Sequence, residues 1–466
     1  MKRRGFITKA VAGGAVLGGT AGMLSPRSIL AKSEAHPSAS EAHLSKTGRR
    51  EVIISQTGKY ELLLKGAHVI DSANGVNSRM DVAVDGGKIA AAGTNIPQAE
   101  ARRTVDLSGL YLTPGFLDIH LHCFYTDDPP GWRWIIADDL CLPSCVTTCV
   151  DVGSSGAGTF EQFKKLIDRS PMRILALINN SFTGMHEGEQ DPAQFKIEPM
   201  VEIAQTYPKI IVGFKTAHYW PSKPYDSLHA PWAAVDAVVE AGRRANLPAM
   251  FDFAPRPASG GYPERSYREL ILKRGRPGDI HTHVFSPSIP TVTPEGKVNP
   301  DLFKARERGF VFDLGHGGGS FVFKHAAPCI EQGFLPNSIS TDLHQISLRN
   351  GTVNMANVMS KMMSLGVSLE NVIRMSTVNP ARIINRPDLG DIKVGNTADI
   401  AVFEVQKGNF SFVDVGGAKN FGDRRIQPLM TIFGGKILFD PAGLSKPCWE
   451  TIPKNDSYWN PPVQPW

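Results

Sequence analysis

Apolar and polar positions alternate between Tyr60 and Gly93, and the alternation stops at short turns rich in Gly, Asn and Asp. The stretch reads YELLLKGAHVIDSANGVNSRMDVAVDGGKIAAAG. Alternation of this kind, broken by such turns, is typical of short antiparallel strands. The same pattern returns after Gly390, in GDIKVGNTADIAVFEV and PLMTIFGGKILF. The two β-rich flanks predict a small β-sandwich that both ends of the chain build together.

The middle of the chain, from about Thr113 to Arg386, has short apolar runs separated by helix-like stretches such as WAAVDAVVEAGRRAN. Eight runs are candidate strands; they end near His122, Gly153, Ser181, Thr216, Ala254, Phe285, Gly315 and Leu343. Eight strand–helix units in roughly 270 residues predict an α/β fold, a (β/α)8 TIM barrel with its active site at the C-terminal strand ends. A doubly wound sheet is the alternative.

The N-terminus, MKRRGFITKAVAGGAVLGGTAGML, combines a short basic region with a weakly apolar stretch, as signal peptides do. Arg3 and Arg4 resemble the twin-arginine export signal, so the expected destination is the periplasm, reached through the twin-arginine export machinery. We therefore expect a signal peptide and disordered leader (1–50), the first part of the sandwich (51–113), the barrel (114–388), and the second part with a C-terminal tail (389–466).

Composition narrows the function classes. The chain has 466 residues, 42% hydrophobic and 20% charged, with a net charge of only +5. No Lys/Arg stripe is interleaved with aromatic residues, so we expect no nucleic-acid partner, and no membrane association once the signal is removed. Pro143 interrupts CLPSCVTTC, which favours buried thiols or one disulfide over a metal cluster among the six cysteines.

The run LTPGFLDIHLH ends in His120 and His122. Residues i and i+2 of an extended chain lie on one face, so both imidazoles can reach one metal ion. Such a pair also occurs by chance and does not decide the matter alone. Further polar residues end other apolar strands, where they are costly unless paired or metal-bound: Lys215, Asp252, His281, His283, Asp342 and His344.

LTPGFLDIHLH, the strand-end Lys215, THVF and STDLH, in this order, resemble the amidohydrolase superfamily of metal-dependent hydrolases. The motifs DVGSSGAGTFEQF, GDIHTHVF, FDLGHGGGSF and VIRMSTVNPARIINRPDLGDIKVGNTADI resemble its dihydroorotase-like deacetylase branch. The resemblance covers about Lys59 to Phe403. It implies a distorted (β/α)8 barrel with a small β-sandwich, which agrees with the fold that the hydrophobic pattern predicts.

The resemblance also implies a site. His120, His122 and Asp342 would bind one divalent ion, and His283 would bind a second. Lys215 would be carboxylated to a carbamate that bridges the two. Zinc is the expected metal, as one ion or two.

Asp252, in AMFDFAPRP, departs from the family, which usually carries a histidine on the fifth strand. An aspartate can ligate zinc, and its extra negative charge would favour a harder ion or a one-metal site. Asp252 is therefore either a metal ligand or a hydrogen-bonding neighbour.

Three further histidines are candidate substrate-binding residues: His218 in KTAHYW, His281 in HTH, and His316 in GHGGGS. His281 is alternatively an extra ligand or a donor to one. GHGGGS resembles the oxyanion-hole motif of lipases, but the chain has no G-x-S-x-G nucleophile motif, which argues against serine hydrolysis.

The predicted function is hydrolysis of an amide of a small molecule, an N-acyl or N-acetyl group or a cyclic amide, by metal-activated water. Asp342 would be both ligand and catalytic base. The alternatives are an esterase for similar acyl substrates, a non-catalytic or weakly active metal-binding barrel, and a one-metal deaminase, in which Lys215 would have no role. Homo-oligomer formation is left open.

Overall fold

The computed structural model describes residues 52–55, 57–125, 134–185, 187–352, 354–454 and 456–458. The expected signal peptide and leader, residues 1–50, lie outside the described residues. Within the described ranges, no helix is both long enough and apolar enough to cross a membrane.

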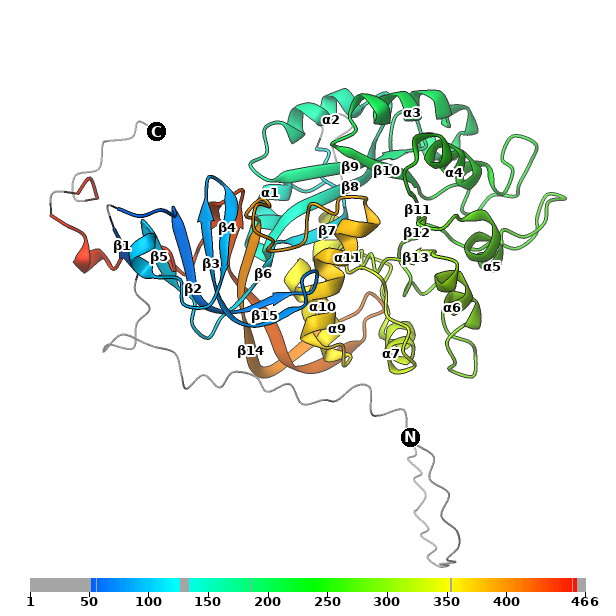
Figure 1. Cartoon of the computed structure of the whole chain (residues 1–466). Helices are drawn as coiled ribbons and strands as arrows, with labels where there is room; N and C mark the ends of the chain where they lie inside the picture. The colour runs from blue at the N-terminus through cyan, green and yellow to red at the C-terminus, as the bar shows by residue number, and fades with distance from the viewer. Residues whose placement is uncertain are drawn as a thin grey trace, which may run out of the picture. The chain divides into compact units, whose positions relative to one another are not determined.

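Both ends of the chain contribute to one mixed sheet of nine strands (Figure 1). Its strands are β1 (Val52–Ile54), β2 (Leu62–Asp71), β3 (Val76–Asp85), β4 (Lys88–Gly93), β5 (Arg103–Asp106), β6 (Tyr111–Pro114), β14 (Ile400–Val413), β15 (Lys419–Phe433) and β16 (Lys436–Phe439). Antiparallel pairing of β6 with β14 joins the two chain ends. A buried apolar cluster that includes Leu64, Leu112 and Val402 fills this sheet's core. The prediction that both flanks contribute to one β structure is confirmed, and the structure shows it as a single mixed sheet where a small sandwich was expected.

The second sheet has seven parallel strands in chain order: β7 (Phe116–Leu121), β8 (Val146–Gly156), β9 (Arg173–Asn179), β10 (Ile211–Thr216), β11 (Ala249–Phe251), β12 (Ile280–His281) and β13 (Val311–Phe312). Helices follow the strands in turn: α1 (Ala137–Cys141), α2 (Phe160–Ile167), α3 (Ile197–Thr206), α4 (Ala233–Ala245), α5 (Tyr267–Glu269), α6 (Pro300–Glu307) and α7 (Phe323–Glu331). The regular strand–helix order is the α/β fold that the hydrophobic pattern predicts.

The segment 338–343, predicted as the eighth strand, forms only isolated bridges. The Leu314 amide donates to the Ser338 carbonyl at 3.1 Å, and the His122 amide donates to the Leu343 carbonyl at 3.0 Å. The segment thus connects the β13 end of the sheet to the β7 end. It is followed by α8 (Gln345–Arg349), α9 (Met355–Ser364), α10 (Leu369–Ser376) and α11 (Val378–Ile383).

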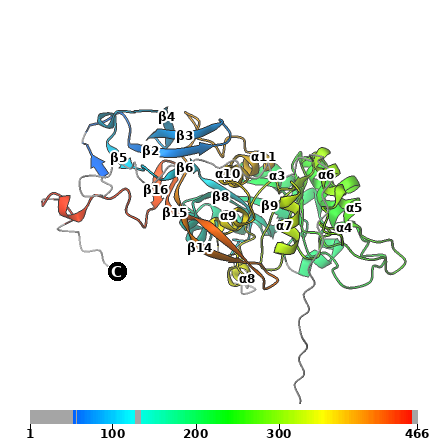
Figure 2. The ribbon, with the colours of Figure 1, turned by 90° about the horizontal axis from the view of Figure 1, so that it is seen from below.

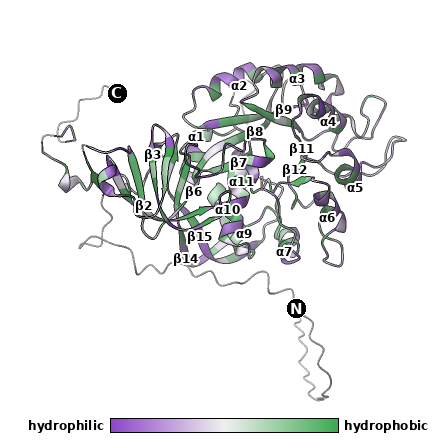
Figure 3. Ribbon diagram, viewed as in Figure 1, coloured by the Kyte–Doolittle hydropathy of each residue, from purple (hydrophilic) through white to green (hydrophobic). Residues whose placement is uncertain are grey.

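Both faces of the seven-stranded sheet are buried, as parallel sheets require. One face carries a cluster of aliphatic side chains that includes Leu117, Val150 and Met250. The other face presents aromatic residues such as Phe214 and Phe251 to the surrounding helices. Figure 3 shows the strands coloured mostly as hydrophobic and the helices with one hydrophilic side. The polar residues at the C-terminal strand ends are the exception to this apolar interior.

The far halves of β14 and β15 form a long hairpin beside α9 (Figure 2). The Ile426 amide donates to Ser360 Oγ at 2.9 Å, and Lys361 Nζ donates to the Val413 carbonyl at 2.6 Å. The nine-stranded sheet therefore also contacts α9, a helix that follows the seven-stranded sheet in the chain.

The cysteines are free thiols within the described residues. Cys123, Cys141, Cys145, Cys149 and Cys329 are buried, and Cys448 is exposed. Burial raises the pKa of the Cys145 thiol to about 11, which keeps it protonated and unreactive. Of the two alternatives for CLPSCVTTC, buried thiols or one disulfide, the structure shows buried thiols.

Candidate metal centre

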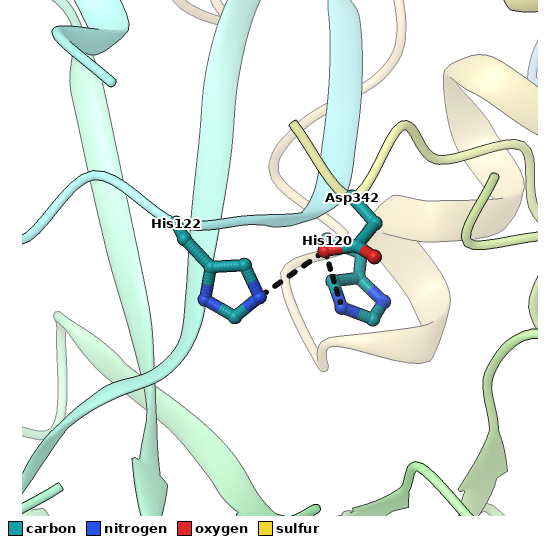
Figure 4. A group of neighbouring side chains, drawn as sticks. All are labelled: His120, His122 and Asp342. Carbon is teal, nitrogen blue, oxygen red and sulfur yellow. Dashed lines mark ion pairs between the residues drawn. The ribbon is translucent and has the colours of Figure 1, made fainter. Parts of the chain in front are cut away.

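His120, His122 and Asp342 form a buried group of potential metal ligands (Figure 4). The two histidines come from the end of β7, and Asp342 comes from the segment 338–343. Asp342 Oδ1 lies 3.4 Å from His120 Nε2 and 3.1 Å from His122 Nε2. Alternation along β7 brings the two rings to the same side, as the sequence predicts.

Hydrogen bonding determines which nitrogen of His120 is available. Thr282 Oγ1 donates its proton to Asp313 Oδ2 at 2.8 Å, so it must accept from His120 Nδ1, which lies 2.8 Å away. The Nε2 lone pair of His120 then points toward Asp342. His122 is arranged similarly, with Nδ1 3.0 Å from Ser154 Oγ. Outer partners of this kind orient metal-binding histidines.

The ionisation states suit a divalent cation. Burial, together with the nearby Lys215 cation, lowers the pKa of His120 to about 3, so this imidazole is neutral. Burial alone would raise the pKa of Asp342, but His120, His122 and His283 hold it well below its usual value. Asp342 Oδ1 is buried and has no hydrogen-bond donor among the described residues. The neutral His120 imidazole, the His122 imidazole and a carboxylate with an unsatisfied oxygen together form a ligand set that suits a divalent metal ion.

Lys215, at the end of β10, lies beside this group. Its side chain is 1% exposed, and Nζ is 3.4 Å from His120 Nε2. Burial lowers its pKa. The close approach of β8 depends on Gly153, because a Cβ there would lie 3.1 Å from Lys215 Cβ and Cγ and the backbone φ is +85°.

His283 and Asp252 face the same space from neighbouring strands. His283 Nδ1 donates to the Gly315 carbonyl at 2.6 Å, which leaves Nε2 3.7 Å from Asp252 Oδ2 and 3.9 Å from Asp342 Oδ2. Burial opposes ionisation of Asp252, but His283, His218 and Lys215 lower its pKa to about 2. The structure thus brings Asp252 next to the predicted ligands, and its role as a ligand stays a prediction.

His218 lies between two carboxylates. Nδ1 is 3.4 Å from Glu189 Oε2, and Nε2 is 3.4 Å from Asp252 Oδ2. Desolvation lowers the pKa of His218, although about half of its side chain (51%) is exposed, and Glu189 and Asp252 raise the pKa to about 9. Glu189 is itself held by Asn179 Nδ2 at 2.9 Å. Sequence reasoning missed Glu189, which follows no strand and belongs to no recognisable motif.

His281 lies away from the other site residues. It pairs in register with Phe251 and Phe312 and is buried against Tyr267, whose ring centroid is 5.1 Å away. His281 and His283 share strand parity, but the φ of +63° at His283 turns the chain there. The two imidazoles therefore point to different places.

His316 is also directed away from the site. Its ring stacks on Phe321 with centroids 4.7 Å apart, and Nε2 lies 2.5 Å from Lys361 Nζ. A cavity over the candidate metal centre is lined instead by the next residues of this loop, Gly318, Gly319 and Ser320.

A cavity of about 260 Å³ lies over the candidate metal centre. Its lining includes His120, His122, Lys215, His218, Asp252, His283, Asp342 and His344, together with Trp134, Met185 and Ile346. His218, His283 and Asp342 have left-handed φ values of 54°, 63° and 49°. Strained non-glycine residues of this kind cluster at functional sites, because the surrounding structure must stabilise them.

Comparison with known proteins agrees with the site. Residues 323–438 match the family model described as the amidohydrolase family. A deacetylase of Agrobacterium fabrum is 29% identical over 372 residues, 78% of this chain and 87% of that protein. A deacetylase of Enterococcus faecalis is 27% identical over 389 residues, 81% of this chain and 99% of that protein.

Two solved structures extend the similarity. One, titled an adenine deaminase, has a TM-score of 0.72 and 25% sequence identity. The match covers 82% of this chain and 100% of the adenine deaminase chain. Another, titled a dihydroorotase, has a TM-score of 0.69 and 28% identity over 81% of this chain and 99% of that one. The chain is thus similar to proteins of the amidohydrolase superfamily, and its relatives over most of its length include deacetylases.

Proposed function

We propose that the protein is a metal-dependent amidohydrolase with a distorted (β/α)8 barrel, which hydrolyses an N-acyl, N-acetyl or cyclic amide of a small molecule. The observation that carries the proposal is the buried His120–His122–Asp342 group, whose Nε2 atoms and unsatisfied carboxylate oxygen converge under a cavity. The similarity to deacetylases over most of the chain supports the choice of an acyl substrate.

A bound divalent ion, which we propose to be zinc, would polarise the scissile carbonyl and lower the pKa of water toward ~7. The protein's own residues perform the remaining tasks. His120 and His122 would hold the ion through Nε2, because Thr282 and Ser154 lie within hydrogen-bond distance of their Nδ1 atoms. Asp342 accepts the proton of the attacking water and returns it to the leaving nitrogen. Its low pKa keeps it ionised and ready for the first of these transfers.

Lys215 is proposed to be carboxylated by carbon dioxide and, with His283 and Asp252, to hold a second ion. Its buried amine has a lowered pKa, so more of it is the neutral nucleophile that attacks carbon dioxide. The N–C bond would form as one C=O π bond opens, and the released N–H proton would pass to water. The carbamate would turn a buried cation into an anion beside His120. This removes the electrostatic problem that an ammonium poses at a cation site.

Metal removal and return test the proposal. The purified protein should lose hydrolysis of N-acetyl amino acids after chelation and regain it with Zn²⁺, with acetate release as the readout and elemental analysis as the metal count. Full activity in a metal-stripped sample would overturn metal-dependent hydrolysis. Because an ester forms a similar tetrahedral intermediate, a matched O-acetyl substrate should be assayed in parallel to establish whether amide or ester is preferred.

Deamination is the second candidate, because of the structural similarity to the protein titled an adenine deaminase. Ammonia release from adenine, measured with the same metal-loaded enzyme, separates the two. A metal-loaded protein that releases neither acetate nor ammonia would favour a non-catalytic barrel.

We also propose export to the periplasm through the twin-arginine pathway, which suits an enzyme that loads its metal before export. Arg3 and Arg4 support this. Cell fractionation tests it: changing both arginines to lysine should retain the protein in the cytoplasm. Subunit number, which we leave open between monomer and homo-oligomer, is measurable by light scattering on the same sample.

A further inference from the structure

A second, smaller cavity of about 110 Å³ adjoins the one over the metal centre. His218 and Asp252 line both cavities, so they form the common wall. Apart from these two, the small cavity has a mainly apolar lining that includes Tyr219, Phe253 and Ala254. Arg265 is the exception, a cation at the wall of an otherwise apolar space.

Arg265 is 5% exposed and is held rigidly. Its Nη1 donates to the Tyr219 carbonyl at 2.9 Å and its Nη2 to the Ala254 carbonyl at 3.1 Å. Paired backbone hydrogen bonds between Arg256 and Arg265, at 3.0 and 2.9 Å, fix the backbone that carries it. The guanidinium also lies over the Phe253 ring, 5.4 Å from its centroid. Its position is therefore determined before any ligand arrives.

The guanidinium lacks an anionic partner in the part of the chain that the structure describes. Its two hydrogen bonds go to neutral carbonyls, and its Nε is buried without an acceptor. Asp252 attracts it only from beyond ion-pair distance. A buried charge without a counter-charge is costly, and a guanidinium fork matches the two oxygens of a carboxylate. A small oxyanion is the kind of ligand that this guanidinium would match.

We propose that Arg265 is a specificity residue that binds a carboxylate of the substrate in the small cavity while the scissile amide lies over the metal centre. This deepens, and rests on, the proposed amidohydrolase function. The substrates are then N-acyl amino acids or similar amides with a free carboxylate, and Arg265 positions the part of the molecule that leaves with the amine. The substrate would extend from the larger cavity past His218 and Asp252, so that its carboxylate lies in the small cavity.

The test compares N-acetyl-alanine with N-acetyl-alaninamide, which lacks the negative charge, on the metal-loaded enzyme. Arg265→Met keeps the length of the side chain and removes the fork. It should raise KM for the carboxylate substrate by about 10- to 100-fold, the usual value of a hydrogen bond to a charged group, and leave the amide nearly unchanged. Arg265→Lys should recover only part of the loss.

Lys223→Met is the matched control, because Lys223 is an exposed cation that lines neither cavity. It removes the same unit of charge and should leave both substrates unaffected. Equal losses in the two arginine variants on both substrates, accompanied by lower thermal stability, would mean that Arg265 only supports the loop, and would overturn the proposal. So would comparable effects of Lys223→Met and Arg265→Met.

Binding separates this inference from the proposed function. Calorimetry with butyrate and butyramide needs no catalysis. Butyrate should bind the wild type at least tenfold more tightly than Arg265→Met, whereas any carboxylate affinity due to the metal persists in both. A binding difference without hydrolysis would leave the anion site standing and refute the hydrolase. Hydrolysis of the acetyl substrates without a difference in butyrate binding would support the hydrolase and refute the anion site at Arg265.

Discussion

Replacing Lys215 with methionine should affect stability and metal binding in opposite directions. Methionine has a similar length but no charge. In the metal-free protein Lys215 Nζ is buried, and its nearest polar neighbour, His120 Nε2 at 3.4 Å, belongs to a neutral imidazole. Replacing a buried ion pair with apolar side chains of similar volume is often neutral or stabilising by about 1–4 kcal/mol, and removing a buried charge without an ion-pair partner acts in the same direction. The metal-free variant should therefore unfold at a higher urea concentration than the metal-free wild type.

The pH dependence gives an independent check. Because burial lowers the pKa of Lys215, the unfolded chain binds more protons at this residue than the folded chain does, and the wild type gains stability as pH rises. This gain is complete near the ordinary lysine value of 10.5. The advantage of Lys215→Met should therefore be largest near neutral pH and shrink as pH approaches that value.

The metal-loaded protein should behave in the opposite way. If Lys215 carries the proposed carbamate, its loss should lower metal content toward one ion per chain or less and acetate release by roughly 10²-fold or more, because a metal ligand would be removed. Urea titrations with chelator, elemental analysis and initial rates measure the three quantities. A metal-free variant that is less stable than the wild type, or a variant that keeps native metal content and rate, would contradict this role of Lys215.

Three further substitutions test the remaining assignments. Asp342→Asn keeps the size of the side chain but removes the base, so the initial rate should fall by about 10²–10⁴ or more; a fall of less than tenfold would assign the base elsewhere. Thr282→Val removes the acceptor for His120 Nδ1 and should weaken metal binding about 10- to 100-fold in a competition with a chelating dye, while unchanged affinity would show that this hydrogen bond does not orient the ring. Asp252→Ala should lower metal content toward one ion and Asp252→His should retain two; an unchanged count in the alanine variant would exclude Asp252 as a ligand.

Local pattern alone determined much of this protein. Alternation identified the strands that both chain ends contribute to one sheet, and apolar runs between helical stretches identified the parallel strands and their order. The spacing of two residues also predicted that His120 and His122 lie on one side of β7, because side chains alternate between the two faces along a strand. Family resemblance added Asp342, which the structure brings to within 3.4 Å of both rings.

The direction of the side chains beyond each strand end depends on the tertiary structure. His281 and His283 have the same parity, yet the first is buried against Tyr267 and the second faces the cavity, because the chain turns at a left-handed residue. The segment before Leu343, predicted as a strand, contributes only isolated bridges.

The partners of the site residues also depend on the tertiary structure. Asp313 fixes the tautomer of His120 through Thr282, and Glu189 holds His218 from a loop without any motif. The small cavity beside Arg265 is formed by residues from separate strands and loops. Periodicity is a local property of the chain, whereas hydrogen bonds and burial between distant segments are not, so the sequence could indicate which residues carry the chemistry but not which of them meet.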